Sequence, residues 1–468
     1  MVFSSPLFLF LFLPLLLLCY WILPLRFRNA LLLCFSLLFY AWGEPVGIFW
    51  LLASICLNYL VGLKLGTSNR SDKNRWLTIG VGANLLFLGY FKYANFLVEQ
   101  VNLGLQSFSL SPLRHDPITL LLGISFFTFQ AISYLVDLYR DEIKPQRNPF
   151  RLALYISFFP QLIAGPIVRY QEIDHDLAHP RKDLAERSLG LQRFILGLAK
   201  KVLIADTLGR TADTVFEMDT TLLSPQVAWL GLICYSLQIF YDFSGYSDMA
   251  IGLGRFFGFH FPENFLGPYR ADSMREFWRR WHVTLSRWFR DYVYIPLGGN
   301  RGSRWRTGVN LLIVFFLCGL WHGAAWNFVI WGLVHGLFLV LERVVHLPVK
   351  IPLMLRHIYV LLVVMLSWVL FRTSTLAEAG RFYRLLAEPY YPGSATSGEN
   401  GSLALYTYPL LWIMLAMGII GLLPWGDWLR TIPTRFPAVR EGAAILLLLF
   451  TLFFVVSSTY SPFIYFRF

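Results

Sequence analysis

Residues 309–341 read VNLLIVFFLCGLWHGAAWNFVIWGLVHGLFLVL, a stretch of 33 residues without a charged side chain. As one continuous helix it would be about 50 Å long, whereas the hydrocarbon core of a bilayer is only about 30 Å thick. The stretch must therefore tilt strongly, protrude or break. Gly319, Gly323 and Asn327 bracket His322, and glycine is the residue at which a helix break costs least. We therefore predict a break beside His322, at membrane depth, where irregular backbone lines a cavity.

The whole chain has the composition of a membrane protein. It is 56% hydrophobic, 17% aromatic and 15% charged, with a mean hydropathy of +0.54, whereas soluble domains are about 45–50% apolar and about one quarter charged. Apolar runs close to the ~20 residues that span a bilayer recur along the sequence. We therefore predict an all-α polytopic membrane protein with about eleven transmembrane helices, give or take about two. The expected spans are Leu7–Leu25, Ala30–Trp42, Val46–Val61, Leu77–Leu97, Ile118–Tyr139, Leu152–Val168, Val227–Phe240, Val309–Leu341, Leu353–Phe371, Leu403–Leu423 and Ala443–Ser457.

The first apolar run is predicted to stay in the membrane rather than to be cleaved. It has no basic residue ahead of it and no small-residue cleavage site behind it, unlike a signal peptide. Arg26 and Arg28 follow it, and because basic loops face the cytoplasm, we expect the N-terminus outside. The longest hydrophilic interruptions are residues 169–193, 262–306 and 388–402. We predict that residues 1–468 form a single integral membrane domain with no soluble module.

The positive charge is concentrated in one segment. The net charge is +12, and residues 270–306 supply half of it with nine arginines against three acidic residues. Trp and Phe interleave with these arginines, which in a polytopic protein favours a membrane-surface or buried amphipathic element over nucleic-acid binding. The five cysteines lie in apolar runs without paired spacing, so neither a disulfide framework nor a metal site is expected. No phosphate-binding loop, zinc triad or Rossmann glycine pattern occurs.

Placed on one helix, the basic segment presents a polar face. At about 100° per residue, Arg275, Arg279, His282, Ser286 and Arg290 fall within one arc of about 80°, next to an apolar arc that contains Trp281. Arginine binds phosphate through planar, bidentate contacts, so this face suits a polyanionic ligand such as a nucleotide diphosphate. Alternatively, the arginines anchor a surface helix in anionic headgroups. The residues predicted to bind a donor molecule are Arg275, Arg279, Trp281 and Ser286.

Polar side chains inside apolar runs are the other candidates for function. A histidine at membrane depth is costly unless it is paired or lines a water-filled cavity, so His322 is a candidate for catalysis or transport, with a structural histidine as the alternative. We expect His335, in a similar setting, to be structural. Residues predicted to line a polar tunnel are Tyr241, Asp242, Ser244, Tyr246, Asp248 and Asn327.

Several motifs taken together resemble those of the membrane-bound O-acyltransferase (MBOAT) family, and most closely its bacterial branch that takes part in alginate O-acetylation. The resemblance covers nearly the whole chain. Its most specific parts are Glu276-Phe277-Trp278-Arg279-Arg280-Trp281-His282, Leu297-Gly298-Gly299-Asn300-Arg301-Gly302 and Gly319-Leu320-Trp321-His322-Gly323. The two polar positions that are diagnostic of the family fall on His282 and His322.

This resemblance implies an MBOAT fold, with re-entrant or amphipathic helices besides the spanning ones, around a central tunnel. It implies a multi-pass protein of the bacterial inner membrane that moves acetyl groups from a cytoplasmic thioester for O-acetylation of an exported polysaccharide, with alginate favoured. The donor would be acetyl-CoA or an acylated carrier protein, without a bound cofactor. The partners would be extracytoplasmic acetyltransferases that resemble SGNH hydrolases, besides the lipid bilayer.

The resemblance also gives the two histidines roles. We hypothesise that His322 is the general base that takes the hydroxyl proton. His282 would orient the donor or polarise its thioester carbonyl, with Arg275 and Arg279 helping to hold an anionic donor. D-alanylation of teichoic acids and acetylation of peptidoglycan or cellulose remain open alternatives. Outside the enzyme class, the alternatives are a transporter or flippase of acyl carriers or polysaccharide, and a structural scaffold.

Overall fold

The stretch 309–341 belongs to a helical hairpin in the computed structural model of the chain, which describes residues 2–179, 183–345, 351–389, 402–423, 437–458 and 460. Helix α15 (Arg304–His322) ends at His322, and α16 (Trp326–Val345) begins four residues later. Gly323, directly after α15, has an extended backbone with φ −165° and ψ 150°. The predicted break beside His322 is confirmed.

Glycines bring the two arms of this hairpin into close contact. A Cβ atom on Gly332 would lie 2.2 Å from the carbonyl oxygen of Phe315, and one on Gly319 would lie 2.3 Å from that of Phe328. Both distances are shorter than any van der Waals contact, so a larger residue at either position would push the helices apart. Small residues let membrane helices approach backbone to backbone in this way. The position of His322 at the tip of α15 is therefore fixed by the packing of α16.

Within the described ranges, every regular element is a helix, and seven helices are long and apolar enough to cross a membrane. Two shorter apolar helical segments, Phe8–Ile22 and Pro409–Leu422, accompany them. The all-α, polytopic membrane fold is thereby confirmed. The seven long helices are α2 (Leu25–Gly43), α3 (Gly47–Thr67), α12 (Pro225–Phe257), α15, α16, α18 (Leu353–Arg372) and α22 (Pro437–Ser457).

Besides Val309–Leu341, two of the expected spans are divided between separate helices. The run Leu77–Leu97 is divided between α4 (Arg70–Leu88), a π-helical turn and α5 (Ala94–Ser107). The run Leu152–Val168 contains α7 (Pro149–Ser157) and α8 (Phe159–Leu162). Its helix breaks at Phe158, whose backbone has φ −59° and ψ 113°. Pro160 lies in the first turn of α8, where a proline is tolerated because its missing N–H has no helical partner there. Three other expected spans contain helices that are too short to count, namely Phe8–Ile22, Ile124–Tyr139 and Pro409–Leu422. Together with these interruptions, they explain why fewer long helices are found among the described residues than the eleven expected.

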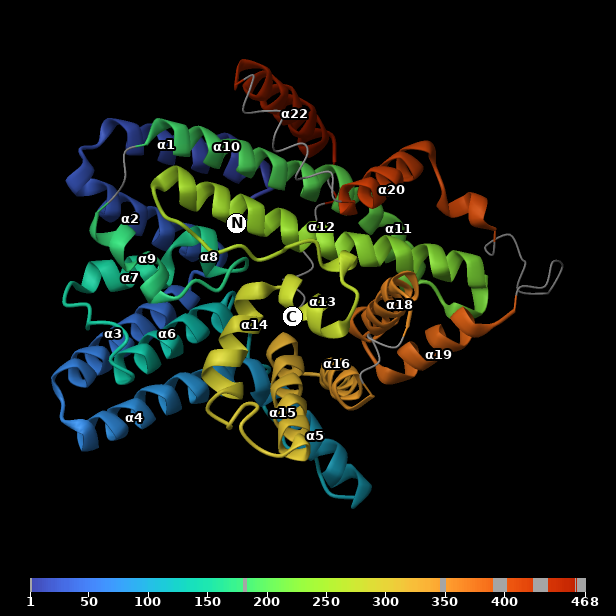
Figure 1. The fold of residues 1–468 in the computed structure, drawn as a ribbon, viewed down its shortest axis with the longest axis horizontal. Coiled ribbons are helices and arrows are strands. Elements are labelled where there is room, and N and C mark those ends of the chain that lie inside the picture. Colours follow the sequence, from blue (N-terminus) through green and yellow to red (C-terminus); the bar gives the residue numbers. More distant parts are fainter. Residues whose placement is uncertain are drawn as a thin grey trace. The chain divides into compact units, whose positions relative to one another are not determined.

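Contacts within the chain divide it into two compact units. Unit 1 comprises Met1–Gly190 and Ala250–Pro262, and unit 2 comprises Leu191–Met249 and Glu263–Phe468. In unit 1, α3, α4 and α6 (Ile124–Tyr139) pack side by side (Figure 1). The other helices that begin in this unit are α1 (Leu13–Ile22), α9 (Tyr170–Ala178) and α10 (Leu184–Ala199). The prediction of a single membrane domain over residues 1–468 stays a prediction.

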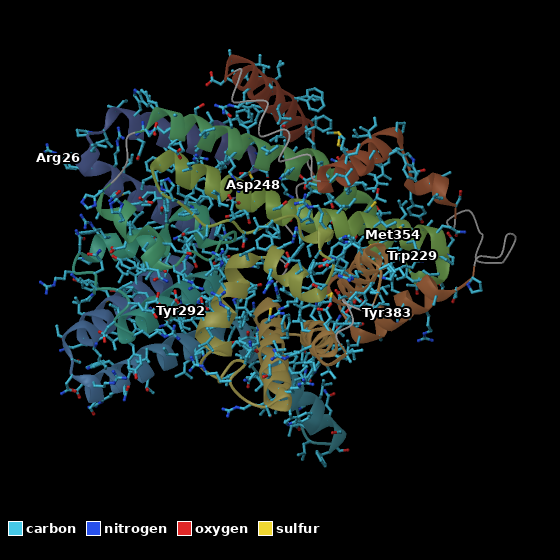
Figure 2. The ribbon with its side chains drawn as sticks, in the orientation of Figure 1. Arg26, Trp229, Asp248, Tyr292, Met354 and Tyr383 are labelled. Atoms are coloured by element: carbon cyan, nitrogen blue, oxygen red, sulfur yellow. The ribbon has the colours of Figure 1, made fainter. Side chains whose placement is uncertain are left out.

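In unit 2, the α15–α16 hairpin packs against α18 and against the short helix α13 (Met274–Arg280). Helix α12 carries Trp229, whose indole N–H donates a hydrogen bond to the carbonyl of Leu386 at 3.2 Å, and the hydroxyl of Tyr383 donates to Leu366 of α18 at 2.8 Å (both aromatic residues are labelled in Figure 2). These two bonds join α19 (Leu376–Ala387) to α12 and α18. The remaining α-helices of unit 2 are α11 (Asp206–Glu217), α14 (Val283–Phe289) and α20 (Pro409–Leu422).

Short segments of tighter or wider helix join or extend the α-helices. They occur where the chain changes direction or where an extra residue is accommodated in a turn. The π-helical segments are Phe8–Phe12, Gly89–Tyr93, Lys200–Ala205 and Arg290–Tyr294, and the 3₁₀ segments are Thr220–Leu222, Pro268–Arg270 and Leu403–Tyr406.

Candidate functional site

His322 is the last residue of α15, and it is enclosed by aromatic rings. The centroid of its imidazole lies 4.9 Å from that of Trp321, 5.0 Å from that of Trp331 and 5.2 Å from that of Phe371, each in an edge-to-face arrangement. These rings come from α15, α16 and α18, and the side chain of His322 is buried. Three helices therefore fix the position of one protonatable ring.

The basic segment is not one continuous helix, so the predicted shared face is wrong. Helix α13 ends at Arg280, Trp281 is extended, and His282 adopts the left-handed conformation with φ 41° and ψ 56° before α14 begins at Val283. The helical hydrogen bonds are replaced by bonds to the loop after α12. The N–H of Leu266 donates to the carbonyl of Arg280, and the N–H of Val283 donates to that of Asn264, both at 3.0 Å. As a result His282 is buried, whereas Arg275 and Arg279 are exposed.

His282 is held by Asn264, a residue that precedes it by 18 positions. The His282 Nδ1 atom lies 3.0 Å from Asn264 Oδ1, and the hydroxyl of Thr284 donates to the same oxygen at 2.8 Å. The Asn264 Nδ2 group donates to the hydroxyl oxygen of Ser247 at 3.0 Å. Burial lowers the pKa of His282 to about 3, so its imidazole is neutral at pH 7.

His335 has both of its ring nitrogens engaged within the protein. The indole N–H of Trp278 donates to His335 Nδ1 at 3.3 Å, so His335 Nε2 carries the proton and donates to the hydroxyl oxygen of Ser367 at 2.9 Å. This is the arrangement expected of the structural histidine that the sequence predicts. The two hydrogen bonds of His335 join α16 to α13 and α18. Trp331, which contacts His322, also contacts His335.

A cavity of about 470 Å³ lies in unit 2 between the basic segment and α15. Its volume is in the range of small-molecule sites. Three of the four residues predicted to bind a donor, Arg275, Arg279 and Ser286, line it, whereas Trp281 and His282 do not. Arg287 and Arg290 are also part of its lining and, like the first two arginines, are exposed. The apolar part of the lining includes Trp278, Val283, Leu285, Phe289, Leu311, Val314, Phe315 and Cys318.

The cavity-lining face of α15 leads toward His322. Leu311, Val314, Phe315 and Cys318 contribute to the lining, and their spacing is that of one face of an α-helix. His322 follows Cys318 by four residues, so it continues the same face about 6 Å further along the axis. The helix geometry therefore places the buried imidazole one turn beyond the lining of the cavity.

Trp281 and Asn327 lie in the packed interior of unit 2. Trp281 stacks on Phe277, with centroids 5.6 Å apart, and lies 5.1 Å from Trp368. The Asn327 side chain donates to the carbonyl of Thr373 at 2.7 Å and thereby joins the start of α16 to the end of α18. Both residues support the helices around His322, and the predicted contacts of Trp281 with a donor and of Asn327 with a tunnel stay predictions.

The polar cluster on α12 forms bonds to neighbouring segments of unit 2. Asp242 pairs with Lys201 at 2.8 Å, and Asp248 (labelled in Figure 2) pairs with Lys200 at 2.6 Å and with Arg193 at 2.9 Å. The remaining members, Tyr241, Ser244 and Tyr246, are buried, and the hydroxyl of Tyr241 donates to the carbonyl of Gly418 at 2.6 Å. None of the five lines the cavity described above, so their role in a tunnel stays a prediction.

Two residues of this region were missed by the sequence reasoning. Arg287 was missed because a continuous helix places it away from Arg275 and Arg279. Asn264 was missed because no spacing rule connects a loop asparagine to a histidine beyond the next helix. A helix-breaking turn at 281–282 also has no Gly or Pro to indicate it.

Sequence comparison identifies the class of protein to which this all-α membrane chain belongs. The profile of the membrane-bound O-acyltransferase family matches residues 140–375, which include every residue of the site. The chain belongs to the MBOAT family. It is therefore an acyltransferase and a multi-pass membrane protein.

Individual relatives are similar over most of their length. The chain is 44% identical over 426 residues to a probable alginate O-acetylase of Azotobacter vinelandii, covering 90% of this chain and 84% of that protein. It is 40% identical over 490 residues to a probable alginate O-acetylase of Pseudomonas putida, covering all of both chains. It is also 40% identical over 419 residues to a peptidoglycan O-acetyltransferase of Helicobacter pylori, covering 81% of this chain and 78% of that protein.

Proposed function

We propose that this acyltransferase moves acetyl groups from a cytoplasmic thioester across the membrane for the O-acetylation of alginate. The observation that carries the proposal is the position of His322, one helical turn beyond an apolar cavity with an arginine-rich lining. The names of the relatives from Azotobacter and Pseudomonas support alginate as the polymer. The site supports a thioester donor because such a donor combines an anionic end with an uncharged acyl arm.

The four arginines of the cavity suit the anionic end of the donor. Guanidinium groups bind phosphate through paired N–H donors, and those of Arg275, Arg279, Arg287 and Arg290 are exposed to receive it. The apolar residues of the cavity suit the acyl arm. Acetyl-CoA and an acylated carrier protein both have this chemistry, so either one fits the proposal, and no further bound cofactor takes part in it.

In the proposed reaction, His322 is the general base. It takes the proton of the acceptor hydroxyl while the hydroxyl oxygen bonds to the thioester carbonyl carbon. The carbon–sulfur bond then breaks, and His322 returns the proton to the leaving sulfur, so that an ester and a free thiol result. Such proton transfer typically accelerates a reaction by about 10²–10⁴-fold, and alignment of the two reactants in one passage contributes further.

The proposal includes the cellular setting. The chain would lie in the inner membrane of a bacterium with its N-terminus outside, because Arg26 and Arg28 then face the cytoplasm. The acetyl group would pass to extracytoplasmic partners that resemble SGNH hydrolases, and these would acetylate the polymer. The relative from Helicobacter favours one alternative acceptor, peptidoglycan.

The test is complementation of an alginate-producing bacterium that lacks its own alginate O-acetylase. The wild-type chain is expected to restore acetyl groups on alginate, and His322→Ala to lower acetylation about 100-fold or more at an equal amount of protein in the membrane. A matched control is His175→Ala, because the side chain of His175 is 72% exposed. Full acetylation by His322→Ala would show that the assignment of the base is wrong.

Two further outcomes separate the alternatives. Acetylated peptidoglycan with unmodified alginate in the complemented strain would replace the proposed polymer. Purified protein in liposomes tests the transporter alternative, since net movement of a whole solute without acyl transfer would contradict an enzyme.

A further inference from the structure

The orientation of the Asn264 amide determines which nitrogen of His282 carries the proton. The backbone N–H of Thr284 faces Asn264 Oδ1 at 3.4 Å, and the Thr284 hydroxyl donates to the same atom at 2.8 Å. A backbone N–H can only donate, so this atom is the amide oxygen rather than the nitrogen. An amide oxygen can only accept. The His282 Nδ1 atom, 3.0 Å away, must therefore be the donor.

The other nitrogen of His282 is then a hydrogen-bond acceptor. A neutral imidazole with its proton on Nδ1 has a lone pair on Nε2. The Nε2 atom of His282 has no hydrogen-bond partner among the residues that the structure describes, although the side chain is 0% exposed. Buried polar atoms are nearly always satisfied, so an unpaired acceptor at a reactive site is available to a donor group of a substrate or to a water.

The backbone at His282 is strained, and hydrogen bonds hold it in that conformation. His282 has a positive φ of 41°, which is unfavourable for a residue with a Cβ atom, and the Val283–Asn264 backbone bond holds the turn. Phe243 lies 4.7 Å from the imidazole and Trp321 lies 5.9 Å from it, between centroids. Trp321 also contacts His322, so His282 and the proposed base both contact the same indole ring.

We propose that Asn264 is a positioning residue that fixes His282 as a hydrogen-bond acceptor, and that His282 Nε2 receives an N–H or O–H group of a bound substrate. The inference rests on the proposed acyl transfer. A thioester carbonyl can only accept, so the carbonyl-polarising role hypothesised for His282 would need a proton that Nε2 does not carry. The group that Nε2 receives is either an amide N–H of the pantetheine arm of the donor or the hydroxyl of the acceptor.

The test uses the full-length chain in inverted membrane vesicles with acetyl-CoA as the donor and acetyl transfer as the readout, measured from about pH 3 to about pH 8, because burial places the pKa of His282 at about 3. Asn264→Leu removes the acceptor for Nδ1–H, so turnover is expected to fall about 10- to 100-fold at every pH, as for other residues that orient a functional histidine. Asn264→Asp keeps the acceptor but adds a negative charge, which raises the pKa of the ring by about one unit or more. A protonated Nε2 donates instead of accepting, so the acid limb of the Asn264→Asp profile should lie about one pH unit or more above that of the wild type.

The two possible sources of the N–H or O–H group give different kinetics. If the donor arm supplies it, Asn264→Leu should raise the KM for acetyl-CoA. If the acceptor hydroxyl supplies it, the KM for acetyl-CoA should stay the same and turnover alone should fall. Each result supports an acceptor role for His282 and identifies the group that it binds.

A matched control is Asn84→Asp, which places a carboxylate at another buried asparagine, hydrogen bonded to Asn58 rather than to a histidine. Its pH profile should have the wild-type shape. If neither Asn264 variant folds, Ser247→Ala removes only the acceptor of the amide Nδ2 group. It should lower the turnover of the folded protein, with a loss of stability of about 1–3 kcal/mol for the unpaired N–H.

The inference is overturned if Asn264→Asp has the wild-type pH profile, or if Asn264→Leu or, failing the Asn264 variants, Ser247→Ala keeps full turnover. A wild-type chain that transfers no acetyl group from either acetyl-CoA or an acetylated carrier protein would instead count against the proposed function.

Discussion

His335 and His282 are both fully buried among the aromatic rings of unit 2, and each is hydrogen bonded through Nδ1. His335 accepts a bond at Nδ1 and donates one from Nε2, so its hydrogen-bonding capacity is used within the protein. His282 donates from Nδ1 to Asn264, and its Nε2 atom has no partner among the residues that the structure describes. The two histidines are therefore equally buried but differ in the hydrogen bonding of their ring nitrogens.

The difference between the two histidines teaches that burial alone does not identify a functional residue. A satisfied histidine stabilises the helices that it joins. An unsatisfied buried acceptor costs about 1–3 kcal/mol, and such a cost is retained where a ligand satisfies the atom during function. The state of each ring nitrogen is thus more informative than the apolar surroundings.

The largest expected effect comes from replacing each histidine with alanine. His282→Ala should lower turnover about 100-fold. It also leaves a cavity, but its loss of stability should be smaller than that of His335→Ala, because the removed ring had an unsatisfied nitrogen. His335→Ala should leave the turnover of folded protein unchanged but lower stability by about 2–4 kcal/mol, because it leaves a cavity and an unpaired Trp278 N–H. The measurements are acetyl transfer per folded molecule and the Tm of purified protein. The opposite pattern would reverse the assignment of the two residues.

Hydropathy was enough to predict the fold class, because spanning a bilayer requires long apolar helices. The break after His322 was also predictable, since glycine lies where a single helix would be too long for the membrane. These features depend on local sequence, so they can be read without knowing what packs against them.

The environment of His282 depends on a contact that no local pattern shows. The residues from Met274 to Phe289 include no glycine or proline, so periodicity predicts one helix. The helix ends at Arg280 because backbone bonds to the loop at 264–266 replace the helical ones. Such a tertiary contact overrides the local preference for helix, and the predicted arginine–histidine face was lost with it.

A smaller effect is expected from substitutions of the exposed arginines. They test donor binding separately from the reaction at the buried histidines. In the double variant Arg275→Gln and Arg279→Gln, the KM for acetyl-CoA should rise about 10-fold, because two charge-assisted bonds are lost, while turnover at saturation is unchanged. The dependence of KM on salt should weaken, since exposed charges are screened by ions. Steady-state kinetics at two ionic strengths measure both effects.

The matched control for the arginines is Arg304→Gln, at an exposed position that does not line the cavity. Its KM should equal that of the wild type. An equal rise in KM for the control and the double variant would favour general attraction to the membrane surface over a donor site.

The smallest expected effect concerns His335, the histidine whose two ring nitrogens are both hydrogen bonded within the protein. Ser367→Ala removes the acceptor of the His335 Nε2–H group, and an unpaired buried donor should lower stability by about 1–3 kcal/mol. Turnover should be unchanged, because His335 only joins helices. In a His335→Ala background the same serine substitution should cost little, since the bond is already absent. Thermal unfolding of the wild type, the two single variants and the double variant measures this coupling. A loss of turnover at constant Tm in Ser367→Ala would show that His335 takes part in the reaction, and the contrast with His282 would then be wrong.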